Sequence, residues 1–175
     1  MATGSLIKID EEIVTSAVAS VTLGGSDWDS SYDVYMVRVN NWLPDTNNVQ
    51  PRVRFTASAT PDTSANYDYA YKGIRADTTF SNTSSTNQTS ILASASTGTA
   101  GNESFNGVLY LFNFNNASEY SFITVEQSTR NQAGNLYALT GGGTLTVSQA
   151  TDGIQFYLDT GNIASGTFTL YGLKK

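Results

Sequence analysis

The 175-residue sequence contains no cysteine and no histidine, and these two absences narrow the chemistry open to it. Without cysteine there is neither a disulfide framework nor a thiolate zinc site. Histidine is the commonest general acid or base near neutral pH, so its absence excludes a Ser-His-Asp or Cys-His nucleophile. A metal site would need carboxylates alone, which suit calcium or magnesium. We therefore expect a non-enzymatic protein with no catalytic residues and no cofactor.

Charge is also scarce, and it is acidic in balance. The chain has nine Lys and Arg residues and fifteen Asp and Glu residues, which gives a net charge of −6. Such a chain lacks the basic surface that binds phosphate backbones or anionic membranes, so we expect neither nucleic acid nor a membrane as a partner. No run approaches the roughly 20 apolar residues of a membrane span, and the N-terminal residues lack the basic-then-apolar pattern of a secretory signal.

Alternation of apolar and polar residues with a period of two predicts β-strands along most of the chain. The clearest case is residues 51–57, where Val53 and Phe55 alternate with Arg52 and Arg54. Further strands are expected over residues 13–23, 32–39, 67–71, 90–96, 107–114, 119–127, 135–140, 144–149, 154–159 and 165–173. The Ser/Thr/Asn-rich residues 77–88 indicate a loop, and Gly141–Gly143 indicate a flexible hairpin.

With the weak segment at residues 90–96 set aside, these are roughly nine or ten short strands with a turn signal every dozen residues or so, a pattern typical of a sandwich or barrel. The sequence therefore predicts an all-β protein, an antiparallel β-sandwich whose best architecture is a jelly roll, with a different Greek-key sandwich as the alternative. We find no solenoid repeat and no linker. Residues 13–175 are expected to form a single β-sandwich domain, preceded by an N-terminal arm over residues 1–12.

Four segments carry a resemblance to a known family: WDSSYDVYMVRVNNWLPDTNNVQPRVRFTAS (28–58), YAYKGIRADTTFSNTSSTNQTS (69–90), GNESFNGVLYLFNF (101–114) and GIQFYLDTGNIASGTFTLYGLKK (153–175). They resemble small structural proteins of tailed bacteriophages that share the ending GNIASGT-x-x-LYG. The resemblance covers most of the chain from Trp28 onward. It implies a protein on the surface of the virion, and it supplies no catalytic residues.

The resemblance leaves more than one place on the particle open. It implies a capsid decoration, or cement, protein that stabilises the head as a homotrimer, or else a tail fibre or appendage subunit. The partners it implies are further copies of the chain, the major capsid protein or other virion proteins, and in the fibre case host surface glycans.

Five aromatic residues are candidates for binding a glycan or for forming an interface, because aromatic rings with polar tips suit both. They are Trp28, Trp42, Tyr67, Tyr69 and Tyr71. The alternative interpretation is ordinary packing on the face of a sheet, or a contact within the trimer, since strands are enriched in tyrosine.

Carboxylates offer two weaker hypotheses. Asp27, Asp29 and Asp33 follow two glycines and suggest a calcium loop, but the spacing is not that of an EF-hand, and Asp is also a common turn residue. A pair such as Glu103 with Glu119, or Asp62 with Asp68, suggests glycoside hydrolysis without histidine. Nothing in the sequence places either pair at the required separation, and coincidence is the simpler interpretation.

Overall fold

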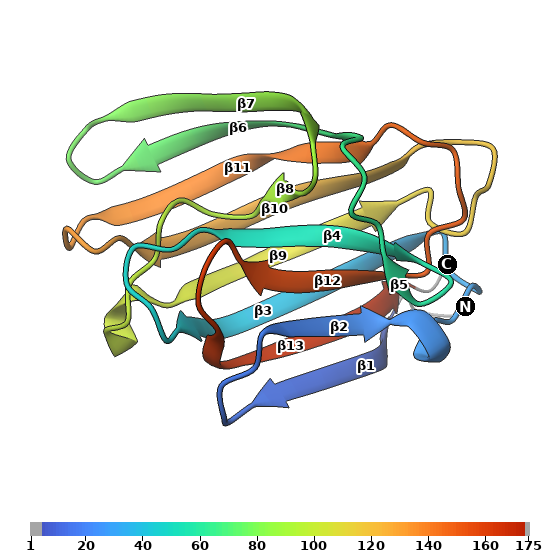
Figure 1. Cartoon of the computed structure of the whole chain (residues 1–175), viewed down its shortest axis with the longest axis horizontal. Helices are drawn as coiled ribbons and strands as arrows, with labels where there is room; N and C mark the ends of the chain where they lie inside the picture. Colours follow the sequence, from blue (N-terminus) through green and yellow to red (C-terminus); the bar gives the residue numbers. More distant parts are fainter. Residues whose placement is uncertain (1–4, 174–175) are drawn as a thin grey trace.

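The computed structural model describes residues 5–173, which fold into two β-sheets packed face to face (Figure 1). Thirteen strands and two short 3-10 turns, Gly25–Asp27 and Gly101–Glu103, are the regular elements of this part of the chain. Every strand pair is antiparallel. The prediction of an all-β antiparallel sandwich is confirmed. No helix within residues 5–173 is long and apolar enough to cross a membrane.

The two sheets differ in width. In order across the sheet, the larger one contains β1 (Leu6–Val14), β13 (Ile163–Leu173), β3 (Val34–Pro44), β9 (Phe105–Phe112), β10 (Ser121–Arg130), β11 (Leu136–Leu145), β6 (Tyr67–Arg75) and β7 (Phe80–Gln88). The smaller one contains β2 (Ser20–Gly24), β12 (Gly153–Leu158), β4 (Pro51–Ala57) and β5 (Thr60–Pro61), and β8 (Ile91–Leu92) also pairs with β4.

Eight of the strands form nested pairs, so that segments far apart in the sequence lie side by side. β1 pairs with β13, β2 with β12, β3 with β9, and β4 with β8. Two hairpins interrupt this nested series: β6 and β7 fall between β4 and β8, and β10 and β11 fall between β9 and β12. Both hairpins extend the larger sheet beyond β9 (Figure 1).

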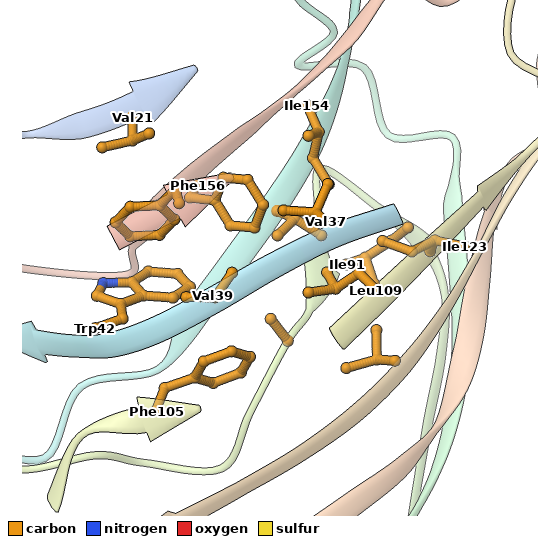
Figure 2. Packing of buried hydrophobic residues seen from close by; sticks show 14 of the residues in the cluster. Val21, Val37, Val39, Trp42, Ile91, Phe105, Leu109, Ile123, Ile154 and Phe156 are labelled. Carbon is orange, nitrogen blue, oxygen red and sulfur yellow. The ribbon is translucent and has the colours of Figure 1, made fainter. Parts of the chain in front are cut away.

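The core lies between the sheets and is built on alternation within each strand. Along β3, Tyr35, Val37 and Val39 are buried and point inward, because successive side chains of a strand face opposite sides of the sheet. Near the end of the same strand, Trp42 is only 1% exposed. Figure 2 shows Val37, Val39 and Trp42 of the larger sheet beside Phe156 of the smaller one.

Trp42 joins four strands through its ring. The centroid of the Trp42 ring lies 5.4 Å from that of Phe105 on β9, 5.8 Å from that of Phe156 on β12 and 5.4 Å from that of Phe168 on β13. Tilted and edge-to-face arrangements at such distances are the favourable ones for aromatic pairs. The indole therefore ties both sheets together near one end of the sandwich.

The N-terminal segment departs from its prediction. From Leu6 onward it is not an arm but the edge strand β1, paired with β13 from Leu6 opposite Leu173 to Val14 opposite Gly166. A bulge between Lys8 and Asp10 shifts the register, so the sequence does not show one uninterrupted alternation. Acidic side chains in this segment suit an edge, where charges oppose unwanted pairing. The first four residues of the expected arm lie outside the described residues.

Two other segments also differ from expectation. Residues 13–23, predicted as one strand, divide between β1 and β2 because the chain crosses here from the larger sheet to the smaller one. Residues 77–88, predicted as a loop, form the edge strand β7 from Phe80 onward. An edge strand with one neighbour buries little of its surface, so it needs few apolar residues, and a composition-based prediction mistakes it for a loop.

We expect Trp42→Ala to lower the free energy of unfolding by about 3–5 kcal/mol, because it leaves a large cavity between the sheets. Chemical denaturation followed by intrinsic fluorescence or circular dichroism measures this loss. The matched control is Phe80→Ala, an aromatic residue that is 64% exposed at the sheet edge. Its cost should stay within about 0.5 kcal/mol. Equal losses for the two variants would contradict the central role of Trp42.

Candidate interaction surfaces

The three tyrosines proposed for glycan stacking face the interior of the sandwich. Tyr67 is 0% exposed and Tyr71 is 5% exposed, while Tyr69 is half-buried against the core. The Tyr67 hydroxyl accepts a hydrogen bond from the Phe55 backbone N–H at 3.0 Å and donates one to the Asp62 carbonyl at 3.1 Å. Burial raises the pKa of both Tyr67 and Tyr71 above the usual range of a phenol, so both remain neutral.

The two tryptophans do not form a platform either. Trp42 belongs to the core, and the half-buried Trp28 ring lies 4.0 Å from the ring of Tyr35 and 5.4 Å from that of Phe114. The glycan-stacking role suggested by the sequence does not fit the burial of these residues. Their alternative interpretation, packing on the inner faces of the sheets, does fit it.

The acidic residues near the first 3-10 turn behave as turn residues. Asp29 accepts hydrogen bonds from the Ser31 hydroxyl and the Ser31 backbone N–H, at 2.5 and 2.9 Å. The bond from the hydroxyl and that from the amide lower the pKa of Asp29. Within residues 5–173, no three acidic side chains lie together in a way that could hold a metal ion. The contacts of Asp29 thus fit the turn interpretation better than the calcium one.

The four carboxylates considered for hydrolysis each accept hydrogen bonds from nearby groups. The donors are the Ser64 N–H and the Gln149 amide for Asp62, the Asn87 N–H for Asp68, the Ala100 N–H for Glu103 and the Asn116 amide for Glu119. For Asp62, the Ser64 and Gln149 bonds outweigh the effect of burial and leave its pKa below the ordinary value. These contacts fit structural roles and leave the paired-carboxylate hypothesis without geometric support.

The outer face of the larger sheet carries aromatic residues that the sequence did not single out. Phe122 on β10 lies opposite Phe112 on β9. Met36 on β3 lies between Tyr110 on β9 and Tyr171 on β13, and it is the cross-strand partner of both. Phe122 is 43% exposed, and the other three aromatic residues are half-buried. We call Tyr110, Phe112, Phe122 and Tyr171 the outer aromatic strip. Residues 107–114 are nearly continuous in apolar character, which predicts a central strand, but the alternation of Leu with Tyr and Phe was a usable signal for the outward rings.

Three consecutive glycines shape this face beside the outer aromatic strip. Gly141–Gly143 do not form the hairpin that the sequence predicted but continue strand β11 between β10 and β6. A Cβ atom at Gly142 would lie 2.5 Å from the Ile123 carbonyl oxygen, and one at Gly141 would overlap the Ala70 carbonyl oxygen. Glycine is therefore required here because the neighbouring backbones approach so closely.

A shallow trough of about 830 Å³ opens on the outer face at these glycines. Register places Ala70 and Gly142 side by side in its floor, with Thr124 next to Gly142. Phe122 borders the trough on β10, and Ser84 on the edge strand β7 borders it on the far side.

Six of the eight large apolar residues that are more than a third exposed within residues 5–173 lie near the two edges of the larger sheet. At the first edge they are Leu6, Ile7 and Ile13 on β1. Toward the other edge they are Ile74 on β6, Phe80 on β7 and Leu136 on β11. The remaining two, Tyr120 and Phe122, lie near the start of β10 in the middle of the sheet. The edge strand β7 has no charged residue in its nine positions, whereas β1 has four. The β7 edge therefore lacks the charges that usually prevent strand pairing.

Comparison of the chain with family models, with curated proteins and with solved structures gave no match.

We expect Gly142→Ala to destabilise the protein by about 1–3 kcal/mol, because the new methyl group would force β10 away from β11. The control is Gly101→Ala, where a Cβ atom would meet no atom within 4 Å. Denaturant titration of both variants measures the difference. If Gly142→Ala were as stable as Gly101→Ala, the close approach of the strands would not be required.

Absorbance titration at alkaline pH tests the buried phenols. Burial raises the pKa of Tyr35, Tyr67 and Tyr71, so the stability they contribute is fully present below the unfolded value of about 10 and is lost as pH rises above it. We expect these three to ionise only together with unfolding, seen as a cooperative step in circular dichroism. Ionisation of all ten tyrosines before unfolding would contradict their burial.

Proposed function

We propose that the protein is a non-enzymatic structural component of a tailed-bacteriophage particle, where it decorates and stabilises the head as a homotrimer. The resemblance of four segments to phage structural proteins supports this role. The observation that carries the proposal is the pair of open edges on the larger sheet, since both carry exposed apolar residues that assembly would cover.

The strand order supports the same assignment. We infer that the fold is a jelly roll, because its eight nested strands form the series β1-β13-β3-β9 and β2-β12-β4-β8. The two inserted hairpins then widen one sheet of that jelly roll. Double-sheet jelly rolls are a common architecture of viral capsid proteins.

The edges also favour a cyclic oligomer. The edge at β1 is charged and bulged, while the edge at β7 is uncharged, so the two differ as surfaces. Contact between one edge of a subunit and a different surface of the next is heterologous, and such contacts form a ring when the rotation between successive subunits closes. A trimer is the ring that a three-fold position on a phage particle accepts.

A second candidate function is a tail fibre or appendage subunit, or a module that binds host glycans. The outer aromatic strip favours it, because an exposed ring flanked by half-buried rings on a sheet face suits sugars as well as proteins. The major capsid protein, or another virion protein, is the expected neighbour for the decoration role.

Oligomeric state and copy number test the first proposal. Light scattering should give a trimer, and gel densitometry of particles should give on the order of hundreds of copies, as expected for a shell protein on repeated three-fold positions. Stripping the protein should make the heads fragile. A handful of copies confined to tails would contradict decoration and support the fibre or appendage role.

A charged variant tests the edge. Phe80→Glu places a carboxylate at the exposed start of β7, beside β6. The Lys72 Nζ atom on β6 lies 5.9 Å from the Phe80 ring centroid, so it can form an ion pair with the new carboxylate and keep the variant folded. We expect this variant to fold and to be monomeric, because a charge at a strand edge opposes pairing. Thr22→Glu, on the exposed side of β2, is the control and should remain trimeric. A Phe80→Glu variant that is still trimeric would place the contact elsewhere.

A further inference from the structure

We propose that the trough at Gly142 binds a neutral oligosaccharide, with the Phe122 ring as its stacking surface. The site concerns the second candidate function, and its occupancy does not depend on where the protein sits on the particle. Tyr69 of the tyrosine run on β6 is among the residues that line the trough, but Tyr67 and Tyr71 are buried in the core, so the exposed ring at this site is that of Phe122.

The shape of the trough suits a small, flat ligand. Its floor at Gly142 and Ala70 has almost no side chain, so a ligand can approach the peptide backbone of β6 and β11. A volume of about 830 Å³ falls within the range of small-molecule sites. A protein partner needs roughly 800 Å² of surface on each side, which is far more than a hollow lined by twelve residues offers.

The ring at the border of the trough gives the apolar contact. Phe122 is 43% exposed and stands on the outer face of β10, opposite the buried side of that strand. Its cross-strand neighbours are Thr144 on β11 and Phe112 on β9, which hold it in the middle of the sheet. The C–H face of a pyranose ring packs well on such a ring because aromatic faces are electron-rich.

The polar groups around the trough match sugar hydroxyls. Ser84, Thr86 and Thr124 bring hydroxyl groups to its border, and each hydroxyl can both donate and accept a hydrogen bond. Asp68 adds a carboxylate whose Oδ1 accepts from the Asn87 backbone N–H at 2.9 Å. A carboxylate can accept several hydrogen bonds, so Asp68 is able to receive a sugar hydroxyl as well.

Charge selects the class of sugar. Of the twelve residues that line the trough, Asp68 alone carries a formal charge at neutral pH, and no Lys or Arg is among them. A sulfated or carboxylated sugar would meet this carboxylate with no Lys or Arg in the lining, and like charges at short range are unfavourable. The chemistry of the lining therefore favours a neutral glycan.

Titration of the purified protein with defined sugars tests the proposal. The probes are neutral hexasaccharides of glucose, mannose and N-acetylglucosamine, with a galacturonate hexasaccharide as the anionic comparison, followed by saturation-transfer NMR and calorimetry. We expect at least one neutral probe to bind saturably and the anionic probe to bind about tenfold more weakly or not at all. Phe122→Ala should weaken binding about fivefold or more, and Thr124→Val, which removes a hydroxyl at nearly constant shape, should weaken it by a smaller factor.

Tyr120→Ala is the matched control, since Tyr120 is an aromatic residue that is 42% exposed just before β10 and does not line the trough. It should leave affinity unchanged, and thermal melts establish that each variant is folded. Absence of binding to every neutral probe, or binding that Phe122→Ala leaves intact, would overturn the proposal. Loss of particle attachment in Phe122→Ala without any sugar binding would also overturn it and assign the trough to a protein contact. None of these outcomes alters the copy number that tests the decoration role.

Discussion

The packing of two sheets of unequal width is the constraint on which the rest of this structure depends. The nested strands supply two matching layers, but the inserted hairpins add four strands to one layer only. Their inner face still has to be covered. The segment around β8 does this: Ile91 and Ala93 are buried, and a Cβ atom at Gly143 would lie only 2.9 Å from the Ile91 Cδ1 atom. The glycines in β11 thus serve the core on one side and shape the trough on the other.

The same inequality produces the outer surface. A sheet of eight strands presents a broad face to solvent, and alternation within each strand fixes which side chains appear there. Leu109 and Leu111 point to the core, so Tyr110 and Phe112 must point outward. The outer aromatic strip therefore follows from burying the intervening leucines in a sheet that has only one face against the core. Its rings become available to a ligand or a neighbouring chain.

How far the sequence predicts this fold depends on the local environment of each strand. Strand β4 matches its predicted range, residues 51–57, because one face is buried and the other is polar. Strand β7 was missed because an edge strand buries too little to need an apolar face, and β11 was divided because Gly141–Gly143 indicate a turn unless the closeness of the neighbouring strands is known. Such closeness is a tertiary property that no short window of sequence records.

The candidate site was harder to predict than the strands. Spacing correctly placed Tyr67, Tyr69 and Tyr71 on one face of a strand, but it could not say which face, because that depends on the partners of β6 across the sheet. Alternation shows which side chains share a face of the strand. Which of the two faces lies against the core follows from the packing of the whole domain. Phe122, the exposed ring beside the trough, lies on β10. Its segment shows the same alternation, but there the aromatic residue faces solvent instead of the core.

The two outer faces of the sandwich differ in what they leave open to a partner. On the smaller sheet, the Arg54 guanidinium lies 4.3 Å from the centroid of the Tyr157 ring, and its Nε donates to the Thr89 carbonyl at 2.9 Å. The cation and the aromatic ring there already engage each other. On the larger sheet, the hydroxyls and the Phe122 ring around the trough face solvent over a bare backbone floor. Recognition of a further molecule is therefore better served by the larger sheet, whereas the smaller one mainly closes the core.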